Sequence, residues 1–96
     1  MLILQTLSRG ANHGYAIAQH IQQISNDALK IGEGSLYPAL QRLLMNDCVI
    51  AEWGVSENNR RARFYKITAT GRKQLSQEKR IFNALLVGIA RVMETP

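Results

Sequence analysis

The sequence contains little that would support a disulfide-linked, membrane-spanning or secreted protein. Its 96 residues include one cysteine, Cys48, which excludes an internal disulfide and any zinc site built from several cysteines. The longest apolar stretch, near residues 85–90, is far shorter than the length of about 20 residues that spans a bilayer. Residues 1–7 have neither the basic segment nor the cleavage-site pattern of a signal peptide. These absences predict a cytoplasmic protein with no membrane segment.

Catalytic motifs are absent as well. The sequence has no glycine-rich phosphate loop, no Ser-His-Asp arrangement and no paired catalytic carboxylates. His13 and His20 lack the cysteines or acidic pair that would complete a metal site with them. A chain of this length buries one small core but hardly a deep catalytic cleft. We therefore expect neither an enzyme nor a bound cofactor or metal.

The chain does contain basic charge, and it is concentrated in one segment. Twelve Lys and Arg oppose seven Asp and Glu, for a formal net charge of +5, and the apolar content of 46% is typical of a folded domain. Residues 60–80 hold eight of the basic side chains against one acidic one, Glu78. That segment therefore carries a charge of +7, and the rest of the chain carries −2. Clustered cations favour a polyanionic partner such as nucleic acid, because phosphate binding requires charges that act together.

The first half of the sequence predicts three helices. Residues 1–7 form the first, which Gly10 ends. Asn12 is the predicted N-cap of the second, which runs to about Ser25. Gly14 near its start indicates that a backbone or a ligand passes close by. The apolar positions of this second helix recur on one face, at Ile17, Ile21 and Ile24.

The third helix is predicted from Ser35, as N-cap, to about Asn46 or Asp47, with Pro38 in the first turn. Its buried arc consists of leucines: Leu36, Leu40, Leu43 and Leu44. Its outer arc carries small and polar side chains together with one cation and one thioether, unlike an ordinary solvated face, which is rich in Glu and Lys. The outer arc comprises Ser35, Pro38, Gln41, Arg42 and Met45, with Tyr37 at its edge.

A β-hairpin follows. Residues 49–55 and 61–67 are rich in β-branched and aromatic side chains, and the polar residues 56–60 between them are turn formers. We expect Trp53 to lie in the core of this hairpin and Cys48 to be a buried thiol. The returning strand begins with three arginines, Arg60, Arg61 and Arg63, so the hairpin is a basic finger.

Thr68 or Thr70 is the predicted N-cap of a long final helix. Its apolar positions recur about every 3.5 residues, which is typical of a coiled-coil seam between two copies of one helix. We therefore predict a homodimer and divide the chain into a DNA-binding unit, residues 1–69, and a dimerisation helix, residues 70–96. The predicted seam comprises Leu75, Phe82, Leu85, Leu86, Ile89, Val92 and Met93.

This order of elements predicts an α+β, mostly α fold: a winged helix-turn-helix with a long C-terminal dimerisation helix. In such a fold the third helix enters the major groove of double-stranded DNA, and the hairpin, or wing, lies along the backbone. Gln41 and Arg42 are then candidates to contact bases, and Ser35 and Tyr37 to contact phosphate. The wing candidates are Asn59, Arg60, Arg61 and Arg63.

Each candidate also has a structural interpretation. Gln41 and Arg42 would simply be exposed, Ser35 would act as a cap, and the wing arginines would form a solvated edge that deters strand aggregation. The alternative function for the whole chain is a winged-helix module that binds a protein. A protein-docking face should be apolar rather than cationic, so the arginines favour DNA.

Three segments resemble motifs of the PadR family of transcriptional regulators. Residues 13–17 (HGYAI) are similar to the family's second helix, and residues 34–40 (GSLYPAL) to the start of its recognition helix. Residues 60–68 (RRARFYKIT), with Gly71, resemble its wing strand and the entry to its last helix. The motifs occur in the family's order and are specific to it, and the resemblance covers residues 2–75.

The resemblance implies a bacterial or archaeal regulator, usually a repressor, that binds DNA as a homodimer formed by the C-terminal helices and the first helix. By motif position it implies a DNA-contacting set of Tyr15, Ser35, Tyr37, Pro38 and the wing arginines. It also implies an effector, because some members respond to small phenolic or flat hydrophobic molecules held near the dimer interface. Two features depart from the family: the first helix is shorter, and residues 72–96 contain Phe82 as their only aromatic residue, so an aromatic-sandwich pocket does not carry over.

Overall fold

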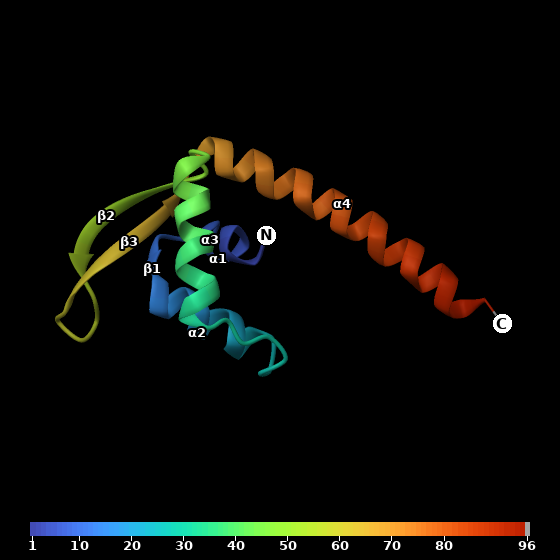
Figure 1. Ribbon diagram of the computed structural model, residues 1–96, viewed down its shortest axis with the longest axis horizontal. Helices are drawn as coiled ribbons and strands as arrows, with labels where there is room; N and C mark the ends of the chain where they lie inside the picture. Colours follow the sequence, from blue (N-terminus) through green and yellow to red (C-terminus); the bar gives the residue numbers. More distant parts are fainter. Residues whose placement is uncertain (96) are drawn as a thin grey trace.

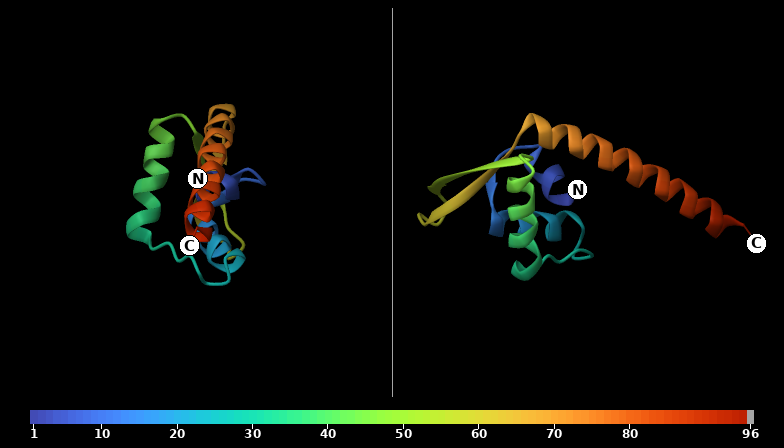
Figure 2. Two further views of the ribbon diagram at one scale, coloured as in Figure 1. Left: turned by 90° about the vertical axis from the view of Figure 1, so that its right-hand side faces the viewer. Right: turned by 45° about the horizontal axis from the view of Figure 1, so that its top comes forward.

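The computed structural model describes residues 1–95 and shows four helices and three strands (Figure 1). Helices α1 to α3 form one packed group, from which the β2–β3 hairpin projects on one side and the long α4 on the other (Figures 1 and 2). This arrangement confirms the predicted winged helix-turn-helix with a long C-terminal helix. The elements are α1 (Leu2–Leu7), β1 (Asn12–His13), α2 (Gly14–Ile24), α3 (Glu33–Met45), β2 (Val49–Val55), β3 (Arg61–Ile67) and α4 (Ala69–Glu94).

The antiparallel sheet has the strand order β1-β3-β2. Strands β2 and β3 pair from Val49 opposite Ile67 to Val55 opposite Arg61, so both strands and the tip at residues 56–60 lie where the sequence predicts them. At the tip the Ser56 N–H donates to the Arg60 carbonyl at 2.8 Å. Strand β1 was not predicted, because two residues are too few to show an alternating pattern.

The core lies among α1, α2, α3 and the base of the sheet. Cys48 is fully buried in it, as predicted, and so are the leucines of the α3 arc that point inward, Leu36 and Leu40. Leu43 and Leu44 pack against the core from its margin. The other buried apolar residues are Ile3, Leu4, Leu7, Ile17, Ile21, Val49, Tyr65, Ile67 and Leu75.

Helix α2 ends where the sequence predicts, with Ser25 as C-cap, but its N-cap and the placement of Ile24 differ from the prediction. Its N-cap is His13 rather than Asn12, because the His13 Nδ1 accepts the Ala16 N–H at 3.3 Å, whereas the Asn12 Oδ1 accepts the N–H of His13 itself. At the other end Ile24 is 71% exposed instead of lying with Ile17 on the core face. The short helix α1 does not cover the last turn of α2, and a hollow of about 280 Å³ lies there instead.

Helix α3 begins three residues earlier than predicted: its N-cap is Gly32 rather than Ser35, its first residue is Glu33, and it has no side-chain cap. Ser35 is therefore not the cap, and Pro38 lies in the second turn rather than the first. The early start places the carboxylate of Glu33 in the first turn, where the helix dipole favours negative charge.

The start of α4 is bonded directly to the segment that joins α3 to β2. The Thr68 Oγ1 accepts the Gly71 N–H at 3.0 Å, which confirms one of the two predicted caps, and donates to the Asp47 carbonyl at 2.6 Å. The Thr68 N–H donates to the Cys48 carbonyl at 3.0 Å. Gly71 packs so closely here that a Cβ atom would collide with the Cys48 carbonyl oxygen and come within 2.8 Å of Ile67 Cγ1. The first turn of α4 with its cap, residues 68–71, which we call the root of α4, is therefore fixed to the end of α3 and the base of the wing.

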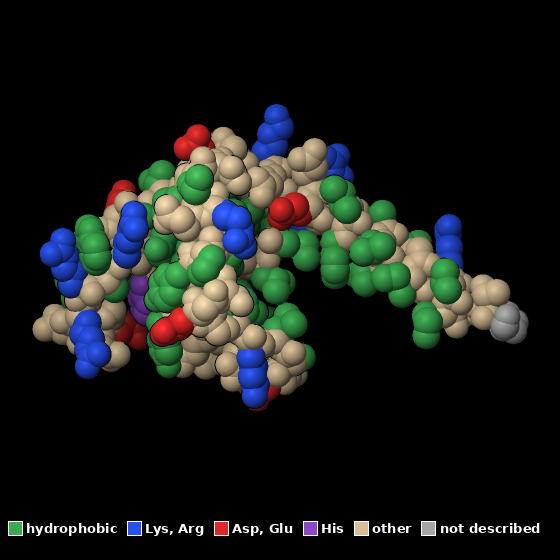
Figure 3. Space-filling view, viewed as in Figure 1, with side chains coloured by type: hydrophobic (Ala, Val, Ile, Leu, Met, Phe, Trp, Pro, Cys, Tyr) green, Lys and Arg blue, Asp and Glu red, His purple; other side chains and the backbone are tan. Residues whose placement is uncertain are grey.

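Leu75 corrects the predicted seam. It is only 6% exposed and belongs to the protomer's own core, because the first turns of α4 pack against α1 and β3. Every side chain from residue 79 to residue 95 is exposed, and most of the apolar ones gather along one side of α4 (Figure 3). The exposed members of the predicted stripe are Phe82, Leu85, Leu86, Ile89, Val92 and Met93. Pro96, the last residue of the predicted dimerisation segment, lies outside the described residues.

Within residues 1–95, no helix is both long enough and apolar enough to cross a membrane.

The contact at Gly71 predicts the effect of a methyl group. Gly71→Ala should lower the free energy of unfolding by about 1–3 kcal/mol, because the added Cβ has backbone rather than a mobile side chain in its way. The matched control is Gly34→Ala in α3, where a Cβ meets nothing within 4 Å and should leave stability unchanged or higher. Urea unfolding of both variants measures the difference. If Gly71→Ala were as stable as Gly34→Ala, the close packing at Gly71 would be contradicted.

Cys48 gives a second prediction. The buried thiol donates to the Gln74 Oε1 at 3.0 Å, and burial raises its pKa above the usual value, with the negative charges of Glu78 and Asp47 adding to the effect. An alkylating reagent at pH 8 should therefore label native protein much more slowly than unfolded protein. Because the unfolded chain releases this proton at lower pH, the free energy of unfolding should also fall as the pH rises through the ordinary thiol range. Rapid labelling of the native protein would show that the thiol is accessible.

Candidate nucleic-acid interface

An open groove of about 620 Å³ separates the wing from the start of α2 and from α3. Its walls combine flat aromatic rings with cations, and lysine and arginine side chains are visible over the wing in Figure 3. The residues that define it are Tyr15 from α2, Tyr37 from α3, and Trp53, Arg60, Arg61 and Arg63 from the wing.

Tyr37 is positioned by Gly14. A Cβ atom at Gly14 would lie 3.0 Å from Cε1 and 3.1 Å from the hydroxyl of Tyr37, so the absence of a side chain lets the ring lie against α2. The sequence predicted a close approach here, and it is made by a side chain rather than a backbone or ligand. Tyr37 is 46% exposed and Tyr15 is 66% exposed. Both side chains line the groove and keep a surface that a ligand there could contact.

On the wing, arginines and aromatic rings share one face of the hairpin. The strand register places Trp53 opposite Arg63 and Val55 opposite Arg61. The Arg61 guanidinium lies over the Trp53 ring, with its Cζ 4.6 Å from the ring centroid, and the Arg63 Cζ lies 5.9 Å from the centroid of Tyr65. These contacts hold two of the three predicted wing cations on the groove side of the sheet.

Trp53 corrects the sequence interpretation. It is 62% exposed rather than part of a hairpin core, because the wing projects beyond the helices and nothing within residues 1–95 packs on the outer part of this face. Sequence reasoning missed it as a site residue. A signal was present in the alternation of the strands, which places positions 53, 61 and 63 on one face.

All ten residues predicted to contact DNA are exposed. The groove brings together five of them: Tyr15, Tyr37, Arg60, Arg61 and Arg63. The remaining five do not line it: Ser35, Pro38, Gln41 and Arg42 lie on the outer surface of α3, and Asn59 lies in the wing tip. Asn59 has a φ of 57°, a left-handed conformation that asparagine tolerates, so it shapes the turn whether or not it binds a ligand.

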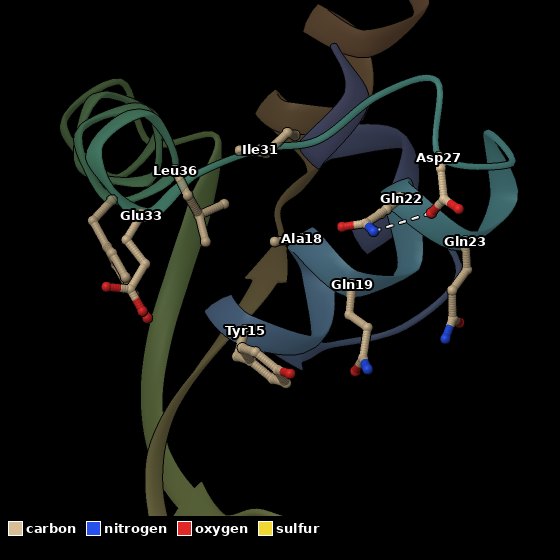
Figure 4. A pocket seen from close by; sticks show the side chains of 10 residues that line it. Tyr15, Ala18, Gln19, Gln22, Gln23, Asp27, Ile31, Glu33 and Leu36 are labelled. Atoms are coloured by element: carbon tan, nitrogen blue, oxygen red, sulfur yellow. Dashed lines mark hydrogen bonds between the residues drawn. The ribbon is translucent and has the colours of Figure 1, made fainter.

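A second hollow, of about 480 Å³, lies between α2 and α3 (Figure 4). Its charge is opposite in sign to that of the wing groove. Gln22 donates to the Asp27 carboxylate at 3.0 Å, and Glu33 projects from the opposite wall. Its lining contains two carboxylates and no lysine or arginine. A polyanion would be repelled here and attracted by the wing groove, so the wing side is the candidate nucleic-acid interface.

Among residues 1–95 there is no group of three or more His, Cys, Asp and Glu side chains placed to hold a metal ion.

Comparison with known proteins identifies related chains. The model of the transcriptional regulator PadR-like family matches residues 3–77. A transcriptional regulator of Mycobacterium tuberculosis is 29% identical over 82 residues, which are 85% of this chain and 76% of that protein. A transcriptional regulator from Clostridium thermocellum has a similar structure, with a TM-score of 0.85 and 29% identity over 94% of this chain and 87% of that one. A PadR-like transcription factor from Bacteroides fragilis is also similar in structure, with a TM-score of 0.75 and 25% identity over 95% of this chain and 85% of that one.

The N-cap of α2, at the edge of the groove, yields a prediction about stability. His13→Ala should lower the free energy of unfolding by about 1 kcal/mol, because the Ala16 N–H loses its side-chain acceptor. His13→Asn restores a capping oxygen and should recover most of that loss. It will not recover the edge-on contact of His13 with the Phe64 ring, whose centroid lies 5.4 Å away. Urea unfolding measures both variants, and equal losses would assign the role of His13 to the ring contact rather than to the cap.

Proposed function

Because the chain belongs to the PadR-like family of transcriptional regulators, whose members are regulators and not enzymes, we propose that it binds specific sequences of double-stranded DNA. The observation that carries the proposal is the groove in which Arg60, Arg61 and Arg63 face the start of α3. A recognition helix beside a cationic wing matches the two parts of a DNA contact, because base edges specify the sequence and phosphates position the protein.

In the proposed complex α3 lies in the major groove. The exposed Gln41 amide suits adenine and the Arg42 guanidinium suits guanine, because each matches the paired donors and acceptors of that base edge. Ser35 and Pro38 lie on the same outer surface near the start of α3 and approach the backbone, as do the Tyr15 and Tyr37 hydroxyls at the groove. The wing residues Asn59, Arg60, Arg61 and Arg63 then follow the adjacent phosphates.

A homodimer is the proposed assembly. The apolar side of α4 remains uncovered along residues 82–93, and burying it against a second copy would remove this surface from water. Two recognition helices related by a two-fold axis would enter successive major grooves. The operator is therefore expected to be an inverted repeat with half-sites about one helical turn apart.

Repression by occupying a promoter is the proposed mode of action, in the cytoplasm where bacterial and archaeal DNA lies. A small hydrophobic or aromatic effector that altered the packing of the two α4 helices would change the spacing of the recognition helices. Release from DNA would follow, because the half-site spacing of the operator does not change.

Selection of bound sequences from a random duplex pool, at about 150 mM salt to suppress non-specific binding, tests the function directly. Enrichment of an inverted repeat would support a sequence-specific dimer. A folded protein that enriches no sequence would contradict the proposal and favour a module that binds protein.

The wing arginines predict a change in salt dependence. Arg60→Gln and Arg63→Gln should each weaken binding to all duplex sequences alike and lower the slope of log affinity against log salt by about 0.9 for each phosphate that the variant no longer neutralises. Arg91→Gln is the matched control, because it removes the same charge from the exposed distal part of α4, far from the groove. Fluorescence anisotropy at several salt concentrations measures the slopes. A loss of affinity confined to the operator would indicate base reading instead.

The uncovered stripe predicts the assembly state. Leu85→Asp with Ile89→Asp should convert the dimer to a folded monomer, because both side chains are exposed in the protomer and the charges would face each other across the seam. The control places two aspartates on the opposite face of α4, at Asn83 and Val87, which are also exposed. Multi-angle light scattering gives the masses. A dimer that survives the first pair of substitutions would refute the seam.

A further inference from the structure

Trp53 is the only tryptophan of the chain, and it is exposed on the wing. Burying a large aromatic ring is ordinarily worth more than any other apolar contact, so its placement outside the core needs another reason. Its ring faces the same groove as the wing arginines. The pairing of the ring with a particular arginine supplies the reason.

The Arg61 guanidinium covers the Trp53 ring at 4.6 Å. The register explains the contact: Arg61 lies opposite Val55, two residues along β2 from Trp53 on the same face, which is the diagonal distance that long side chains reach. Within residues 1–95 no carboxylate forms an ion pair with Arg61. The indole ring is therefore the group that orients this guanidinium in the free protein.

We propose that Trp53 is a positioning residue, which holds the Arg61 guanidinium in the orientation that binds a DNA phosphate. A guanidinium stacks through its flat face, whereas its N–H donors point outward in the plane of the group. Stacking on Trp53 therefore leaves the donors free for phosphate oxygens. This inference rests on the proposed DNA-binding function.

The contact with Trp53 would strengthen DNA binding by reducing the conformational entropy that Arg61 loses on binding. A long arginine side chain in solvent populates many rotamers and loses that freedom when it binds phosphate. A stack that restricts the side chain beforehand reduces the loss on binding. Lysine cannot replace arginine in this arrangement, because its ammonium lacks the planar edge that stays free while the face is covered.

The first experiment detects the contact between the Trp53 ring and the Arg61 side chain in the absence of DNA. In the free protein, the Arg61 Hδ protons should show upfield ring-current shifts in the NMR spectrum. Trp53→Leu should remove these shifts, and Trp53→Phe should retain part of them. Unshifted Arg61 protons in the wild-type protein would overturn the proposal, because no ring would then be orienting the side chain.

The second experiment is a double-mutant cycle of Trp53→Leu and Arg61→Gln. Affinity is measured for a fluorescein-labelled duplex that carries the selected inverted repeat, and for one of unrelated sequence. Trp53→Leu should weaken binding to both duplexes by about two- to five-fold for each wing in contact, the range expected of an exposed cation–π pair. Trp53→Phe should restore part of the affinity. In the Arg61→Gln background, Trp53→Leu should have no further effect.

Controls separate the possible failures. Ile50→Ala changes an exposed apolar residue on the other face of β2 and should not alter affinity, and urea unfolding verifies that each variant is folded. Equal effects of Trp53→Leu in both backgrounds would overturn the positioning role, because Trp53 would then act independently of Arg61. A wild-type protein that binds neither duplex would overturn the proposed function and this role with it. Binding that is insensitive to Trp53→Leu would overturn this role alone.

Discussion

The contact between Gly71 and the Cys48 carbonyl is the constraint on which the rest of the structure depends. Three parts of the fold meet there: the end of α3, the start of the wing, and the root of α4. Thr68 reinforces the junction by bonding to the carbonyls of Asp47 and Cys48, at 2.6 and 3.0 Å. Because backbone meets backbone at Gly71, no side-chain rotation can relieve a displacement, and the three parts keep one relative orientation.

This junction connects the two surfaces to which function is assigned. The proposed DNA-binding surface lies on α3 and the wing, and the proposed dimer surface lies on the exposed part of α4. Since the root of α4 is fixed to both α3 and the wing, the packing of two α4 helices would determine the separation of two recognition helices. A small change at the seam would therefore be transmitted to the DNA-binding surface as a rigid-body shift, which is the simplest physical basis for control by an effector.

The limits of the hairpin were predictable because they depend on local chemistry. Alternating β-branched and aromatic residues flank a five-residue polar tip, and both strands begin and end where that pattern does. The candidates for DNA contact on the outer face of α3 and in the wing could likewise be proposed from helix and strand periodicity. Tyr15, on α2, was proposed only from the motif that resembles the PadR family. The start of α3 was misplaced because Gly32 is a weaker signal of an N-cap than Ser35.

Errors of a different kind concern positions where burial depends on tertiary structure. Leu75 and Phe82 continue one apolar period, and the sequence does not reveal that the domain covers the first and leaves the second exposed. The exposure of Trp53 depends on how far the wing projects beyond the helices, which no local pattern reports. The charge difference between the two hollows also required the structure, because Asp27 and Glu33 come together only when α2 and α3 pack.

The measurement that most directly tests the central claim is the change in backbone amide NMR shifts when the protein is titrated with its selected duplex. We expect the perturbed amides to lie in the wing, along the outer face of α3 and at the start of α2. Tyr15 and Tyr37 also line the acidic hollow between α2 and α3, so the amides expected to stay unaffected are those of its far wall, around Gln22 and Asp27. Perturbations concentrated on that far wall, or beside Ile24 at the end of α2, would contradict the assignment of the wing groove as the DNA-binding surface.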